Sequence, residues 1–185
     1  MRRALAAAVV PHLAGPSPRI LDAGCGSGDV LATLRRASGD RALAVGLDLK
    51  PLHLTAAPAA IHRVAGDVRA LPFAPRSFDV VTASLFLHHF DGADVARVLR
   101  ELHRVARRAL VVNDLRRSRV PYAFGRAVFP LLFRSHVSVE DGLLSIRRAF
   151  TADELARAFA DAGLAATVSR NWPYRLLAVA RKDAV

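Results

Sequence analysis

Short apolar runs alternate with helical patterns along the first two thirds of this 185-residue chain. The runs are typical of parallel strands, which are buried on both faces, and the segments between them repeat apolar residues every three or four positions. The predicted strands are residues 19–23, 42–47, 61–65, 78–84 and 109–112, and the predicted helices are 29–37, 51–60 and a long one from Asp94. Strands that alternate with helices predict an α/β fold with a parallel sheet.

The last third of the chain follows a different order. Thr151 and Glu154 form a capping-box pair that predicts the start of a helix, and Gly163 is its expected stop. Two apolar runs follow, at 164–169 and 175–180, and the short connection between them favours an antiparallel pair. We therefore predict one domain over residues 1–185. Its fold class is α/β, with a doubly wound, mostly parallel seven-stranded sheet whose last strand is antiparallel.

Composition narrows the class of protein. The one cysteine, Cys25, has no disulfide partner, so we expect a reducing, cytoplasmic location. Residues 4–10 are read as a short first helix rather than a signal peptide, and no apolar run approaches the roughly 20 residues that span a bilayer. The net charge of +11 is compatible with an anionic partner, but a coding bias toward arginine explains it equally well.

Acidic or polar residues stand at the ends of successive predicted strands. In open parallel sheets ligands bind beyond the carboxyl ends of the strands, so these side chains are expected to line one crevice. They are Asp22, Asp48, Asp67, Ser84 and Asp114. Between Asp22 and the first long helix lies a loop with glycines at 24, 26 and 28, which allows a tight turn and a close approach of the backbone to a ligand.

The segment from Ile20 to Gly28 resembles the first motif of class I methyltransferases that use S-adenosylmethionine. The layout of the whole chain is similar to that family, in particular to its ubiquinone and menaquinone type. The resemblance implies a Rossmann-like fold and S-adenosylmethionine as the cofactor, with S-adenosylhomocysteine as the product.

The same resemblance assigns a role to each position of the motifs. Asp22, Ala23 and the loop of Gly24, Cys25, Gly26 and Gly28 are expected to hold the methionine part of the cofactor, with Ser84 at the neighbouring strand end. Asp48 is expected to bind the ribose and Leu49 to pack on the adenine. Asp67 and the Val68 backbone are expected to read the amino edge of the adenine.

Other nucleotide-binding classes fit less well. A dehydrogenase loop has the form G-x-G-x-x-G, which this chain matches only in part. A phosphate-binding P-loop is excluded because no lysine and hydroxyl pair follows the glycines. A binding protein without catalysis remains an alternative, and no metal site is expected because no trio of carboxylate or amide ligands is apparent around Asp114.

Three histidines are candidates for a general base, which is needed when the acceptor carries a proton. His88 and His89 follow the fourth predicted strand, and in an extended chain only one of them would face the crevice. His89 is preferred, and the alternative is that both pack against or cap the next helix. His136 is the second candidate base.

Residues 116–150 form the least regular segment, which we predict to be an acceptor-binding insertion or lid. Its aromatic residues suggest an apolar pocket, although a small helical pair explains the spacing of several apolar positions as well. They are Tyr122, Phe124, Phe129, Phe133 and Phe150. Because the segment is also basic, peripheral contact with an anionic membrane is a further hypothesis.

Only about 18 residues precede the first strand, so we expect this insertion, a neighbouring subunit or a partner to close the cofactor site, and we predict a homodimer.

The leading hypothesis is therefore methyl transfer to a hydroxyl of a small, apolar acceptor, phenolic or polyketide-like. Methylation of carbon on a quinol ring is the closest alternative. Modification of RNA or protein is a further alternative that the net charge raises, but no nucleic-acid module accompanies the domain, so no nucleic-acid partner is expected.

Overall fold

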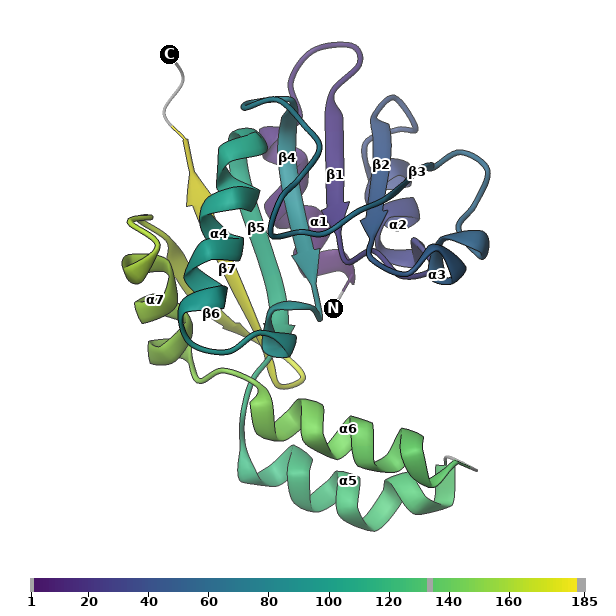
Figure 1. Cartoon of the computed structure of the whole chain (residues 1–185), viewed down its shortest axis with the longest axis vertical. Coiled ribbons are helices and arrows are strands. Elements are labelled where there is room, and N and C mark those ends of the chain that lie inside the picture. The colour runs from purple at the N-terminus through teal and green to yellow at the C-terminus, as the bar shows by residue number, and fades with distance from the viewer. Residues whose placement is uncertain (1, 133–134, 183–185) are drawn as a thin grey trace.

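Seven strands form a single twisted sheet (Figure 1), and the computed structural model describes residues 2–132 and 135–182. The order across the sheet is β3-β2-β1-β4-β5-β7-β6. Six strands are parallel, and β7 is antiparallel to both of its neighbours. The strands are β1 (Arg19–Ala23), β2 (Leu43–Asp48), β3 (His62–Ala65), β4 (Phe78–Ser84), β5 (Ala106–Leu115), β6 (Thr167–Asn171) and β7 (Arg175–Arg181). This arrangement confirms the predicted fold class.

Helices cover both faces of the sheet, and the strands send alternate residues to each face. Ile20 and Val80 pack with α1 and α2, whereas Leu21 and Val81 pack on the opposite face with α4 and α7. The sequence shows continuous apolar runs here because both faces are buried. The helices are α1 (Arg2–Val9), η1 (Val10–His12), α2 (Asp29–Ala37), α3 (Pro51–Thr55), η2 (Leu87–His89), α4 (Ala93–Val105), α5 (Arg119–Leu132), α6 (His136–Arg148) and α7 (Ala152–Asp161).

The local signals at several element ends are confirmed. The Thr151 hydroxyl accepts the Glu154 backbone N–H at 3.2 Å, and the Glu154 carboxylate accepts the Thr151 N–H at 2.8 Å, which completes the capping box of α7. Gly163 has the left-handed φ of 74° expected after a helix end. The first helix is also present, and α2 has the predicted bounds.

Three predicted elements differ from the structure by three residues or more at one end or both. The helix expected at 51–60 ends at Thr55, because Pro58 disfavours helical backbone at the residue before it. β5 continues through Asn113 and Asp114 to Leu115, since β7 pairs with it along that whole length. β6 begins at Thr167 rather than Leu164.

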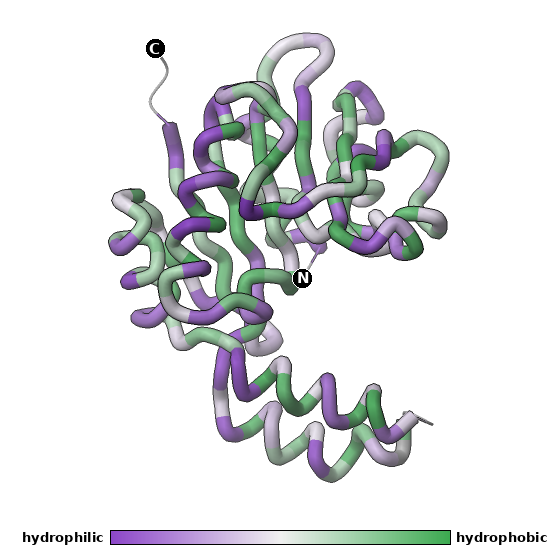
Figure 2. The backbone as a smooth tube through the Cα atoms, viewed as in Figure 1, coloured by the Kyte–Doolittle hydropathy of each residue, from purple (hydrophilic) through white to green (hydrophobic). Residues whose placement is uncertain are grey.

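The described part of residues 116–150 contains two antiparallel helices, α5 and α6, which project from the carboxyl edge of the sheet (Figure 1). The two helices approach closely at Gly125 and Gly142, where an added Cβ would meet the Phe129 ring at 3.1 and 3.0 Å. Figure 2 shows hydrophobic and hydrophilic positions alternating along both helices. Phe133, one of the aromatic residues of this segment, lies outside the described residues.

Among residues 2–132 and 135–182, no helix has the length and apolar character that crossing a membrane requires.

Candidate functional site

The glycine loop after β1 depends on left-handed backbone at three positions. Gly24, Gly26 and Gly28 have φ values of 69°, 53° and 75°, which residues with a Cβ rarely adopt. The backbone N–H groups of Gly24 and Cys25 donate to the Leu47 carbonyl at 2.8 and 3.1 Å. The loop is thereby fixed to the end of β2, and α2 begins directly after it.

Asp48 organises the end of β2. One carboxylate oxygen accepts the Gly26 N–H at 3.0 Å, and the other accepts the Lys50 N–H at 2.9 Å and lies 3.3 Å from His53 Nδ1. The carboxylate therefore joins the glycine loop to the start of α3. His53 was not predicted from the sequence, because it lies five residues after Asp48 with no motif that marks it.

Asp67, at the end of the loop after β3, is held by Arg69. The guanidinium reaches both carboxylate oxygens, with Nη2 at 2.7 Å from Oδ2, and the Arg69 N–H donates to Oδ1 at 2.9 Å. These hydrogen bonds lower the pKa of Asp67. Arg69 is a further residue that sequence reasoning missed, since the basic residues are too numerous for one to stand out.

Asp22 lies below the glycine loop rather than in the open crevice. Its side chain is 1% exposed and accepts a hydrogen bond from the Thr82 hydroxyl at 2.7 Å. Burial raises the pKa of Asp22 to about 7. The neighbouring Cys25 thiol packs on Gly46, and burial raises its pKa to about 12, so it is not a reactive thiol.

The carboxyl ends of β1 to β4 enclose a cavity of about 410 Å³. Six of the residues predicted to bind the cofactor line it: Gly24, Gly26, Asp48, Leu49, Asp67 and Val68. The other five, Asp22, Ala23, Cys25, Gly28 and Ser84, are not among the lining residues. Of these, Asp22 and Ala23 belong to the buried strand β1, and Gly28 packs against Ile61 and Ala57.

An aromatic wall closes the side of the cavity nearest β4. Leu85 has a left-handed φ of 55°, which turns the chain sharply after β4. The turn brings the Phe86 ring over the glycine loop, where a Cβ on Gly24 would lie 2.2 Å from the ring. Phe90 packs edge-on against Phe86 with ring centroids 5.1 Å apart. Gly24 is therefore required for this aromatic contact as well as for the turn.

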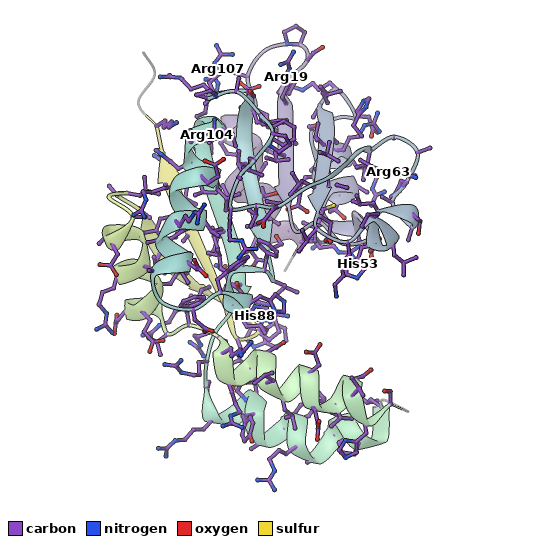
Figure 3. All side chains as sticks on the ribbon, in the orientation of Figure 1. Arg19, His53, Arg63, His88, Arg104 and Arg107 are labelled. Carbon is purple, nitrogen blue, oxygen red and sulfur yellow. The ribbon has the colours of Figure 1, made fainter. Side chains whose placement is uncertain are left out.

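The two adjacent histidines occupy different environments because residues 87–89 form a 3₁₀ turn, η2, rather than the extended chain considered above. His88, which Figure 3 labels, is 4% exposed, and its Nδ1 lies 2.7 Å from Asp114 Oδ1. Asp114 Oδ2 also accepts the His88 N–H at 3.2 Å. His89 instead lines the cavity.

Of the three candidate bases, His89 is the one that lines the cavity and can accept a proton there. Burial, followed by the nearby His88, lowers its pKa below the usual 6.5, so the imidazole is neutral at pH 7. Its ring lies 4.2 Å from that of His88, which is fixed by Asp114. His89 thus packs against a residue that Asp114 anchors to β5.

The structure does not bring His136 to this cavity. It is the first residue of α6, and its imidazole is 86% exposed, 3.3 Å from the Glu140 carboxylate. Among the described residues, no group of three His, Cys, Asp or Glu side chains is placed to hold a metal ion.

The arrangement suits a ligand with a polar, hydroxyl-bearing part and an apolar part. Carboxylates at Asp48 and Asp67 can accept hydrogen bonds from hydroxyl or amino groups, and Leu49 and Val68 provide apolar surface between them. Gly26 has no atom within 4 Å of an added Cβ, so its backbone is open to a ligand. A neutral imidazole and an aromatic wall stand at the other end.

Comparison with known proteins gives the following matches. Residues 21–109 match the model of the methyltransferase domain family. A demethylmenaquinone methyltransferase from Roseiflexus sp. (strain RS-1) is 39% identical over 114 residues, which are 59% of this chain and 47% of the relative. A malonyl-[acyl-carrier protein] O-methyltransferase from Dechloromonas aromatica (strain RCB) is 42% identical over 88 residues, 48% of this chain and 32% of the relative.

Among solved structures, the plantazolicin methyltransferase BpumL, in complex with a triazolic desmethylPZN analog and SAH, superposes with a TM-score of 0.78. The identity is 15%, and the match covers 99% of this chain and 85% of the other. The chain spans about half or less of the length of the curated relatives it matches.

Proposed function

We propose that the chain is a class I S-adenosylmethionine-dependent methyltransferase, and that it transfers the cofactor's methyl group to a hydroxyl of a small, apolar acceptor. One observation carries the proposal: the glycine loop, Asp48 and Asp67 line the same cavity. Those are the positions at which the family resemblance expects the cofactor.

In this proposal the ends of β2 and β3 would hold the nucleoside part of the cofactor. The Asp48 carboxylate would accept the ribose hydroxyls. The hydrogen bonds that it accepts from the Gly26 and Lys50 N–H groups, together with its contact with His53, fix its orientation. Leu49 covers one face of the adenine, and Asp67 with the Val68 backbone faces its amino edge. Gly26, whose backbone is open to a ligand, would hold the methionine part.

The chemistry at the other end requires alignment, exclusion of water and a place for one proton. The sulfonium supplies an already activated methyl group when the cofactor is bound. Phe86 and Phe90 provide an apolar surface that orients an aromatic acceptor and excludes water. His89 takes the proton of the acceptor hydroxyl as the new oxygen–carbon bond forms and the sulfur–carbon bond breaks.

Methylation of carbon on a quinol ring is the second candidate. The observation that favours it is the repeated match to proteins named demethylmenaquinone methyltransferases. The same cavity serves both reactions, since a quinol presents hydroxyl groups and ring carbons to the same base. The two are distinguished by whether the methyl group of the product is lost under conditions that cleave aryl ethers.

Cofactor binding is tested by titrating the protein with S-adenosylhomocysteine in a calorimeter. We expect an affinity in the micromolar range, and Asp48→Ala should weaken it at least about 100-fold, because hydrogen bonds to a charged group are each worth about 1.5–3 kcal/mol. An acceptor screen read by the mass gain of one methyl group then tests turnover. Binding without any methylated product across phenols and quinols would favour the non-catalytic alternative.

Two variants control the titration. Asp48→Asn keeps one acceptor oxygen and should lose less affinity than Asp48→Ala. Asp153→Ala removes an exposed carboxylate on α7, far from the lining of the cavity, and should leave binding unchanged. Unaltered affinity in Asp48→Ala, with the protein still folded, would remove the ribose role from this residue.

A further inference from the structure

The α5–α6 hairpin exposes an apolar face that nothing in the described chain covers. Val120 and Phe124 are 59% and 60% exposed, and Ala123 and Ala127 are exposed beside them at helical spacing. We call these four residues the outer face of α5. Exposed aromatic and β-branched residues that gather in one patch indicate an interaction surface.

This face is exposed because α5 uses its other side to pack on α6. Gly125 and Gly142 bring the two helices together around the Phe129 ring, and Gly125 also approaches Leu143. These contacts use the side of α5 that faces α6, so the outer face of α5 takes no part in the packing of the hairpin. At the far end of the hairpin, Leu132 and Val137 are 67% and 75% exposed.

The charge around the outer face is of one sign. Arg119 and Arg126 are exposed and, at helical spacing, follow one edge of the apolar stripe. The sequence contains no acidic residue between Asp114 and Glu140, a stretch with five arginines. Residues 116–150 as a whole contain seven arginines and two acidic residues.

We propose that the outer face of α5 binds an anionic lipid surface, with Phe124 and Val120 entering the headgroup region and Arg119 and Arg126 meeting lipid phosphates. An apolar stripe edged by arginine is the pattern of helices that lie in the membrane interface. The hairpin projects from the sheet edge with α5 on the side away from the sheet (Figure 1), so the sheet does not block the approach of a planar surface to α5. The inference does not depend on the proposed function, although a lipophilic acceptor would be collected there.

A protein partner is the less favoured occupant. An acidic carrier would account for the arginines, but its charged surface would leave Phe124 and Val120 without an apolar contact. A second copy of the chain would bring two arginine-rich edges together, and like charges facing each other oppose association. The lipid surface satisfies both the apolar and the cationic residues.

The test is cosedimentation of the full chain with vesicles. We expect binding to vesicles of phosphatidylcholine mixed with phosphatidylglycerol, little binding to phosphatidylcholine alone, and weaker binding as salt increases. Phe124→Ser should weaken binding about tenfold or more through lost apolar contact. Arg119→Gln/Arg126→Gln should weaken it by at least about tenfold, since each arginine near such a surface favours binding.

Matched controls use the same chemical changes elsewhere. Leu52→Ser alters an apolar side chain on α3 that is 78% exposed. Arg36→Gln/Arg157→Gln removes two exposed charges, one from α2 and one from α7. Both control variants should bind vesicles as the parent does. The proposal would be overturned if Phe124→Ser and the parent bound vesicles equally. It would also be overturned if the parent formed a dimer that Phe124→Ser abolished, or if the parent bound an acidic carrier protein tightly and did not bind vesicles. Calorimetry with S-adenosylhomocysteine, expected to be unchanged in Phe124→Ser, separates this result from failure of the proposed function.

Discussion

His88 and Asp114 meet inside the sheet, whereas His136 and Glu140 meet on the outside of the hairpin. The buried pair is 4% and 0% exposed with its closest atoms 2.7 Å apart, and the exposed pair is 86% and 72% exposed at 3.3 Å. Both are a histidine beside a carboxylate, so residue type alone does not separate them. Burial separates the two pairs, because water screens the electrostatic attraction within an exposed pair but not within a buried one.

The difference extends to the regions that contain the two pairs. Around the cavity, backbone N–H groups, carboxylates and aromatic rings are held by neighbours from several strands. In the hairpin, two helices pack mainly on each other and present exposed side chains outward. The first region is built to fix a ligand in one geometry, and the second is suited to a surface contact.

The largest expected effect separates His89 from His136. His89→Gln should lower turnover about 100-fold or more, the usual contribution of a positioned base, while affinity for S-adenosylhomocysteine stays the same. His136→Gln should leave turnover unchanged, because its ring does not line the cavity. Both are measured as the rate of methylated product at saturating cofactor.

The pH dependence sharpens the same comparison. A base must be neutral, so the rate should fall as pH decreases through the pKa of His89, which burial sets below 6.5. The acidic limb should be lost in His89→Gln and kept in His136→Gln. An unchanged rate in His89→Gln at neutral pH would exclude it as the base.

The next effect concerns the buried pair. Asp114 accepts hydrogen bonds from the His88 N–H and the Leu115 N–H and lies beside His88 Nδ1, so Asp114→Asn would turn an amide group toward a donor. We expect a loss of about 3 kcal/mol in the free energy of unfolding, measured by urea denaturation. Asp161→Asn, at the exposed end of α7, is the control and should cost almost nothing. A similar stability for both variants would show that the buried pair contributes little.

Most of the fold could be predicted from the sequence because each strand is buried on both faces and ends at a marked residue. The apolar runs around Ile20 and Val80 predict buried strands, and the glycine loop marks the first turn. Asp48 and Asp67, which the sequence proposes as cofactor-binding residues, line one cavity because they lie at or just after the ends of neighbouring strands. Local pattern and tertiary position agree in this half of the chain.

The remaining features depend on contacts that have no sequence spacing. Arg69 and His53 are recognised only by the carboxylates they touch. The separation of His88 from His89 follows from the 3₁₀ turn at residues 87–89. The chain enters this turn after Leu85, whose left-handed conformation no glycine marks. The continuation of β5 through Asp114 requires the partner strand β7, which arrives some sixty residues later.

The smallest expected effect is on the exposed pair, and it tests the comparison from the opposite side. Glu140→Gln removes the charge that lies four residues after His136 on α6, where such pairs contribute about 0.3–0.5 kcal/mol to a helix and salt reduces even that. The free energy of unfolding should therefore change by less than about 0.5 kcal/mol, and turnover should not change. A loss near that of Asp114→Asn would mean that the hairpin pair is shielded from water when the protein is in solution, and the contrast between the two regions would then fail.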